Sequence, residues 1–190
     1  MIRTREISTD DRKMKELILY LAVKSEGDPR FSSTKLNKLL FYCDFEAYRR
    51  LGHSITGHSY QKLPFGPAPK AVLPILSQMQ RDGDCDEVRK DDFGREQRRV
   101  KANRPSEIAV FAAEELRLAD QMIEELWESS ASEVSERSHG LIGWQAAEYN
   151  EVIPDVTVFL GGPSTPVIED ESEFCRQLER DAEDLSFSSL

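Results

Sequence analysis

Residues 35–69, KLNKLLFYCDFEAYRRLGHSITGHSYQKLPFGPAP, begin with a helical pattern that is apolar over too much of its circumference to bury only one face. Between Leu36 and Tyr48, apolar residues recur at three- and four-residue steps, and an aromatic flank lies beside this stripe. The stripe comprises Leu36, Leu39, Leu40, Cys43 and Ala47, and the flank comprises Phe41, Tyr42, Phe45 and Tyr48. We therefore expect either a central helix that the same domain covers on both sides, or a helix that meets a partner.

The flanks of this helix carry boundary signals. A cap at Ser32 or Ser33 and a stop at Gly52 are expected, because serine caps helix starts and glycine accepts the left-handed conformation at helix ends. Downstream, the glycines and prolines of residues 53–69 oppose a long helix and predict an ordered loop. Its apolar Leu63 and Phe65 could serve as anchors for a partner, or the loop could fold back onto the helix.

The remaining periodicities predict short elements around this centre. Helices are expected near residues 10–24, 67–81, 112–128 and 130–138, a charged hairpin over 84–104 and a strand over 153–160. The predicted fold class is α+β and predominantly α-helical, a compact helical domain with a small antiparallel hairpin or sheet.

Length and charge favour one domain with an acidic extension. The chain has 190 residues and a net charge of -10. Residues 168–190 contain eight acidic and two basic residues, so this segment contributes -6 and the rest contributes -4. We expect a domain over residues 1–162 and a helical or partly disordered extension over 163–190. This balance disfavours non-specific nucleic-acid binding by the whole chain.

Composition also indicates which cofactors and which cellular compartment to expect. The three cysteines form no CxxC pair, so no structural zinc is expected, and no other cofactor is indicated. Membrane association is not expected, because no apolar run approaches the ~20 residues of a transmembrane helix. The N-terminal residues lack the pattern of a signal peptide, so we expect a cytoplasmic protein.

A local basic patch lies in the predicted hairpin. Between Arg95 and Arg104 there are five basic residues and one acid. Arg98, Arg99 and Lys101 are therefore candidates for nucleic-acid binding in the manner of a winged helix. Charges that protect an exposed edge strand from aggregation are the alternative interpretation.

Catalytic chemistry has little support. A hydrolase could combine Cys43 or Ser138 with His58 or His139 and with Asp44, but Cys43 lies on the core stripe, where a thiol is usually inert. No nucleophile-elbow, Walker A, dinucleotide or zincin motif is present. We expect no enzymatic activity, and a structural role in which His139 bonds a backbone carbonyl or packs against Trp144.

Several motifs occur together in a specific order. The helix KLNKLLFYCDFEAYRRLG is followed by ITG and LPFGPAP, and then by the Ser138-His139 pair, Trp144 and VTVFL. This order resembles the Panacea domain of SocA-like antitoxins over about residues 10–160. The chain departs from the family at Asn37, where a glutamine is frequent, and at Cys43, where an aromatic residue is frequent.

The resemblance implies an antitoxin of a toxin–antitoxin system, associated with phage defence, that neutralises a cognate toxin by direct protein–protein binding. Some members of the family also deliver the toxin to a cellular protease as an adaptor, and self-association into a homo-oligomer stays open. The expected toxin-binding residues are Tyr42, Phe45, Tyr48, Arg49, Leu63 and Phe65. The alternatives are a DNA-binding regulator that uses the basic hairpin and a small hydrolase.

Overall fold

The computed structural model describes residues 10–92 and 95–160, and these form an α+β fold that is predominantly helical. The helices are α1 (Asp11–Lys24), α2 (Ser33–Leu51), α3 (Val72–Asp82), α4 (Ala113–Glu125), α5 (Ala131–His139) and α6 (Ile142–Ala146), with 3-10 helices η1 (Ile108–Val110) and η2 (Asp155–Leu160). The strands are β1 (Tyr60–Leu63), β2 (Gly66–Pro69), β3 (Cys85–Asp92), β4 (Arg95–Ala102) and β5 (Val152–Ile153). The predicted fold class is confirmed.

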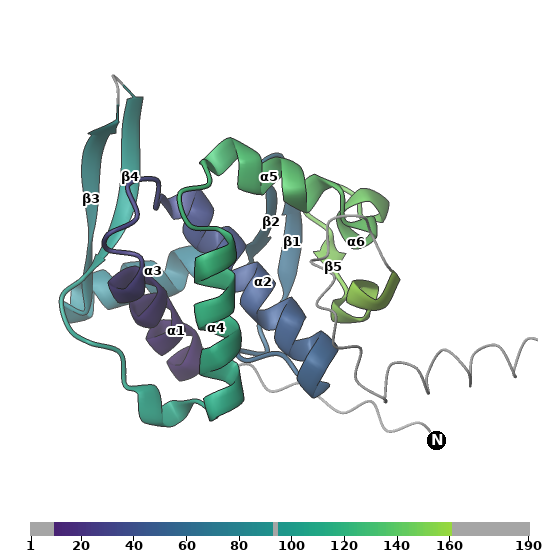
Figure 1. Ribbon diagram of the computed structural model, residues 1–190, viewed down its shortest axis with the longest axis horizontal. Coiled ribbons are helices and arrows are strands. Elements are labelled where there is room, and N and C mark those ends of the chain that lie inside the picture. The colour runs from purple at the N-terminus through teal and green to yellow at the C-terminus, as the bar shows by residue number, and fades with distance from the viewer. Residues whose placement is uncertain (1–9, 93–94, 161–190) are drawn as a thin grey trace, which may run out of the picture.

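Helix α2 is the centre of the molecule. The Ser32 hydroxyl accepts a hydrogen bond from the Lys35 N–H, and Gly52 ends the helix with φ 75°, as the sequence predicted. Helices α1 and α4 pack on one side of α2, and β2, α5 and η2 contact it elsewhere (Figure 1). Nearly every residue from Lys35 to Ala47 is consequently buried. The over-apolar pattern therefore reflects a helix that its own domain covers on several sides.

Residues 60–69, predicted as part of an ordered loop, form a β-hairpin instead. Strands β1 and β2 pair antiparallel with Tyr60 opposite Pro69 and Lys62 opposite Pro67, in a sheet of order β2-β1-β5. Proline has no N–H to donate, and β2 tolerates two prolines because it lies at the sheet edge. The third helix accordingly begins at Val72 and not near Pro67.

The predicted charged hairpin is present as β3 and β4, which pair from Cys85 opposite Ala102 to Asp92 opposite Arg95. It projects beyond the helices in Figure 1. At its base Cys85 and Val100 are buried and join the hydrophobic core. The base of the hairpin is thus anchored in the core.

The C-terminal part of the domain differs from the prediction. Helices α4 and α5 are confirmed, but the strand expected over 153–160 is wrong: β5 ends at Ile153 and η2 follows. Pro154 cannot donate to a strand ladder, and its carbonyl accepts a hydrogen bond from the Thr157 N–H across 3.0 Å, which turns the chain into a 3-10 helix. The dense β-branching of this segment was a weaker determinant than the proline.

Two predictions concern the limits of the domain. The predicted acidic extension over 163–190 lies outside the described residues. In the ranges 10–92 and 95–160, no helix is long and apolar enough to cross a membrane, and no group of side chains has the composition of a metal site.

Candidate functional site: the tip of the β1–β2 hairpin

Three segments that are distant in sequence meet at the tip of the β1–β2 hairpin. Lys38 comes from the first turns of α2, Gly66 comes from the start of β2, and Ser138 comes from the end of α5. Contacts between α2 and β2 and between α5 and β2 bring the three together. The site is therefore assembled by tertiary packing and not by any one motif.

Lys38 supplies a buried amine to this site. Its side chain is 1% exposed, and Nζ donates a hydrogen bond to the Pro67 carbonyl oxygen across 2.9 Å. Among the described residues it forms no ion pair with a carboxylate. Burial disfavours the charged form and lowers the pKa of Lys38 from 10.5 to about 7.

Gly66 lets the hairpin approach these side chains. Its φ is +92°, a conformation that residues with a Cβ rarely adopt. A Cβ on Gly66 would lie 2.2 Å from Ser138 Oγ and 2.7 Å from Lys38 Cε. Ser138 is itself fully buried and donates to the Ser135 carbonyl across 2.7 Å. Glycine is the residue that both the backbone conformation and the available space require here.

An aromatic stack lies beside the same tip. The rings of His139 and Trp144 are stacked with centroids 4.1 Å apart, and Lys62 Nζ lies 4.3 Å from the Trp144 centroid. Burial and the charge of Lys38 lower the pKa of His139, although a hydrogen bond to the Pro64 backbone opposes this effect. The His139 ring thus packs against Trp144, and a structural role for His139 stays a prediction.

The tip itself presents an apolar side chain to solvent. Phe65 is 72% exposed, and the adjacent Pro64 is also exposed. Leu63, on the other side of the turn, is half-buried. Of the six predicted toxin-binding residues, Phe65 has the geometry of an anchor that projects from a fixed support.

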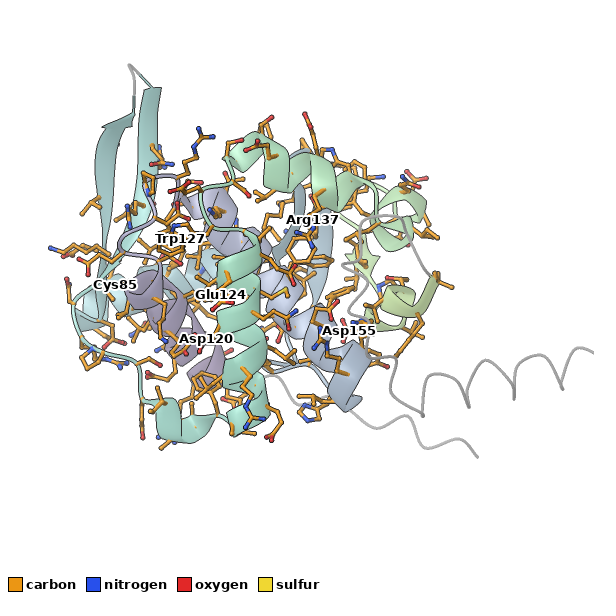
Figure 2. All side chains as sticks on the ribbon, in the orientation of Figure 1. Cys85, Asp120, Glu124, Trp127, Arg137 and Asp155 are labelled. Carbon is orange, nitrogen blue, oxygen red and sulfur yellow. The ribbon has the colours of Figure 1, made fainter. Side chains whose placement is uncertain are left out.

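Two other predicted toxin-binding residues belong to the core. Phe45 and Tyr42 are each 5% exposed. The Phe45 ring contacts Phe41 and Tyr60, with centroids 4.1 Å and 5.7 Å away. Arg137 of α5 is labelled in Figure 2. Its guanidinium lies over the Tyr42 ring and pairs with Glu125 of α4 across 3.0 Å. The aromatic flank of α2 is therefore covered by β1 and α5 and is not a free surface.

Tyr48 and Arg49 lie near the opposite end of α2. Both are half-buried; the Tyr48 ring contacts Phe159 with centroids 6.0 Å apart, and Arg49 pairs with Glu46 across 2.9 Å. Ten residues separate Lys38 from Tyr48, which is about 15 Å along a helix. Tyr48 and Arg49 therefore lie at the other end of α2 from Lys38, which contacts the hairpin tip.

The basic hairpin divides into exposed and structural residues. Arg98 and Lys101 are exposed. Arg99 instead donates to the backbone carbonyls of Ser25 and Asp28 across 2.8 Å and 3.2 Å, and its guanidinium lies 5.3 Å from the Phe31 ring centroid. Arg99 thus docks the hairpin onto the α1–α2 connection, and two of the three candidate nucleic-acid contacts remain available to a ligand.

Asp44 and His58, two of the groups considered for hydrolysis, contact other side chains, and Cys43 is buried. The carboxylate of Asp44 accepts from the Thr56 N–H and hydroxyl and from the Tyr60 hydroxyl. His58 Nε2 lies 3.1 Å from Asp11 Oδ1, and Cys43 is fully buried. Burial raises the pKa of the Cys43 thiol well above its ordinary value, which opposes thiolate formation.

Sequence reasoning assigned no role to Lys38 or Gly66. The sequence pattern around Lys38 did contain a signal. Lys38 lies four residues before Tyr42, so both residues lie on one side of a helix that is otherwise apolar there. For Gly66 the signal was its place between Phe65 and Pro67 in a turn. Neither position revealed that Ser138 would complete the site.

A family model matches this chain. The model of the family described as "Antitoxin SocA-like, Panacea domain" matches residues 36–145, more than half of the chain. The matched range includes α2 from Leu36 onward, the hairpin tip and the His139–Trp144 stack. No curated protein and no solved structure matches the chain.

Proposed function

We propose that this chain, which belongs to the SocA-like, Panacea-domain antitoxin family, neutralises a cognate protein toxin by binding it directly. The observation that carries the proposal is Phe65, an aromatic side chain that is 72% exposed at the tip of a hairpin. Aromatic anchors dominate many protein interfaces. A tip that is already ordered before binding also loses less conformational entropy on binding.

The tip would act as the central anchor, with Leu63 and Lys62 beside it. Lys62 Nζ lies over the Trp144 ring and donates to the Ala147 carbonyl across 2.9 Å. Interfaces of ordinary size bury about 800 Å² on each partner. A toxin of that footprint could also reach Tyr48 or Arg49, whereas Tyr42 and Phe45 would support the surface from the core.

The proposal is tested by co-expression with the product of the adjacent reading frame, scored by growth. Phe65→Ala should abolish or strongly weaken neutralisation, because it removes the exposed ring and leaves the packing of the core intact. Leu73→Ala is the matched control, since Leu73 on α3 is an apolar residue that is 73% exposed. It should neutralise as the unmodified chain does.

A folding control separates binding from stability. Both variants should unfold in urea within about 0.5 kcal/mol of the unmodified chain, as surface substitutions generally do. If Phe65→Ala is folded and still neutralises the toxin fully, the hairpin tip is not the docking site.

The fate of the toxin distinguishes two modes of neutralisation. Direct binding leaves the amount of toxin in the cell unchanged and yields a complex that can be isolated. We propose this mode as primary, because an exposed anchor on a fixed support suits a stable complex. A protease-dependent fall in toxin amount when the antitoxin is present would instead assign the adaptor role.

A further inference from the structure

A lysine without an acidic partner lies directly beneath the exposed tip. Lys38 Nζ bonds the carbonyl of Pro67, which is two residues from Phe65 in the chain. A lysine ammonium has three N–H donors, and one hydrogen bond to a neutral carbonyl satisfies only one of them. A charged ammonium is therefore poorly accommodated in this place, whereas a neutral amine fits it.

The groups around Lys38 come from each element packed against it. On β2 they are the backbone of Gly66 and Pro67, and on α5 the Ser138 hydroxyl. His139 of α5 interacts electrostatically with Lys38, with Glu136 of α5 and with Lys62 of β1, and Tyr42 follows Lys38 by one turn on α2. No carboxylate among the described residues bonds the Lys38 amine. Opening of the tip is what would expose this amine to water.

We propose that Lys38 is a positioning residue for the docking tip: its neutral, buried amine holds the Gly66–Pro67 backbone and so fixes Phe65, and protonation of Lys38 favours opening of the tip. The inference rests on the proposed function only where it calls the tip a docking site. Its physical content, a proton-linked opening of the β1–β2 hairpin, concerns this chain alone.

The pH dependence of tip opening follows from the pKa of Lys38 in the closed and open states of the tip. When the tip is closed the pKa of Lys38 is about 7, and when the tip is open the amine returns toward its ordinary value of 10.5. Between these values the open state binds more protons, so the open population falls by up to about tenfold for each pH unit of increase. Below about pH 7 the linkage saturates. His139 titrates on the acid side of this window, because its pKa is lowered from 6.5.

The experiment uses the full chain and needs no toxin. NMR titration of the Lys38 side chain should give a midpoint near 7. Hydrogen-exchange protection factors of Leu63 and Gly66, which face each other across the ladder, should rise from pH 7 to pH 9 after correction for the intrinsic rate. A Lys38 midpoint near 10, or protection that is flat with pH, would overturn the proposal.

Substitution locates the effect in one side chain. Lys38→Met keeps an unbranched side chain one atom shorter and removes the titrating amine, so the rise in protection should disappear. Lys70→Met, in the exposed position just after β2, should retain it. A rise that persists in a folded Lys38→Met variant would assign the linkage to another group. If that variant fails to fold, the NMR titration of the unmodified chain still decides the question.

Toxin binding then separates this inference from the proposed function. If tip protection depends on pH but Phe65→Ala neutralises normally, Lys38 controls a hairpin that is not the docking site. If both hold, toxin affinity should increase from pH 7 to pH 9 in the unmodified chain and stay constant in Lys38→Met.

Discussion

The Tyr60 hydroxyl donates a hydrogen bond to the Asp44 carboxylate across 2.7 Å, and both side chains are at most 1% exposed. The same hydroxyl lies 2.8 Å from the Leu40 carbonyl oxygen. Thr56 completes the site with its N–H and its hydroxyl on Asp44. This cluster fastens the beginning of β1 to the middle of α2 and thereby sets the direction in which the hairpin leaves the core.

Tyr60→Phe should raise the pKa of Asp44. Burial raises this pKa to about 6, and the hydrogen bonds from Thr56 and Tyr60 oppose the effect, so loss of the Tyr60 hydroxyl removes an opposing contribution. A ¹³C NMR titration of the Asp44 carboxyl should find a midpoint above that of the unmodified chain. An unchanged midpoint would contradict the assignment of this hydrogen bond.

The same substitution should affect stability in a pH-dependent way. The folded pKa of Asp44 exceeds its ordinary value of 3.8, so the folded chain binds more protons between about pH 4 and pH 6, and the Asp44 contribution to stability falls as pH rises through that window. In Tyr60→Phe the upper limit of the window moves to higher pH. Urea unfolding at pH 7 should show a loss of about 1–2 kcal/mol.

Glu16→Gln should destabilise the chain at neutral pH. Glu16 is 4% exposed and accepts hydrogen bonds from Arg104 across 2.8 Å and from the Glu107 N–H across 2.7 Å. Burial raises the pKa of Glu16, but these hydrogen bonds outweigh it and the net pKa is lowered. The carboxylate therefore contributes stability above about pH 4.5 that is lost as the pH falls through the folded pKa.

Urea unfolding should detect a loss of about 1–3 kcal/mol for Glu16→Gln at pH 7 and a smaller loss at pH 3. Glu107→Gln is the control, because Glu107 is half-exposed and its partner Arg12 is also exposed. A surface pair of this kind contributes little, so that variant should stay within about 1 kcal/mol of the unmodified chain. Equal losses of unfolding free energy in Glu16→Gln and Glu107→Gln would contradict the expectation that the burial of Glu16 makes its ion pair more stabilising.

Gly66→Ala should cost more stability than Gly83→Ala. Both glycines have positive φ, so the conformational cost of roughly 1–2 kcal/mol applies to each. A Cβ on Gly83 meets nothing within 4 Å, whereas a Cβ on Gly66 meets Ser138 and Lys38. In thermal unfolding the melting temperature of Gly66→Ala should therefore be lower than that of Gly83→Ala. The reverse order would be inconsistent with the packing at the tip.

Arg99→Ala should loosen the β3–β4 hairpin. Its hydrogen bonds to the Ser25 and Asp28 carbonyls involve a charged donor, and their loss should cost about 1.5–3 kcal/mol. Arg98→Ala should cost less than about 0.5 kcal/mol, because Arg98 is 62% exposed. Urea unfolding measures the free energy of unfolding of Arg99→Ala and of Arg98→Ala and so distinguishes these two outcomes.

A double variant of the exposed basic residues tests the DNA-binding alternative. If the hairpin binds a promoter, an Arg98→Ala/Lys101→Ala variant should lose salt-dependent affinity without losing stability. If that variant binds as the unmodified chain does, the exposed arginine and lysine of β4 are not a nucleic-acid contact.

Local signals in the sequence predicted most of the helices. Ser32 and Gly52 bound α2 because side-chain capping and positive φ are local properties. The strand expected over 153–160 failed because Pro154 and a local hydrogen bond outweighed β-propensity. The β1–β2 hairpin was missed because two prolines argue against a strand, and only the order of the sheet shows that β2 lies at its edge.

The sequence by itself determined that α2 is surrounded by apolar contacts, that Phe65 lies in a constrained turn, and that the motif order is that of an antitoxin family. Only the tertiary structure decided which aromatic residues face solvent. Helical periodicity gives the direction of a side chain but not what covers it, and here β1 and α5 bury Tyr42 and Phe45 while the turn leaves Phe65 exposed. The placement of Lys38 beneath that turn likewise depends on contacts across 29 residues of sequence, which no local pattern records.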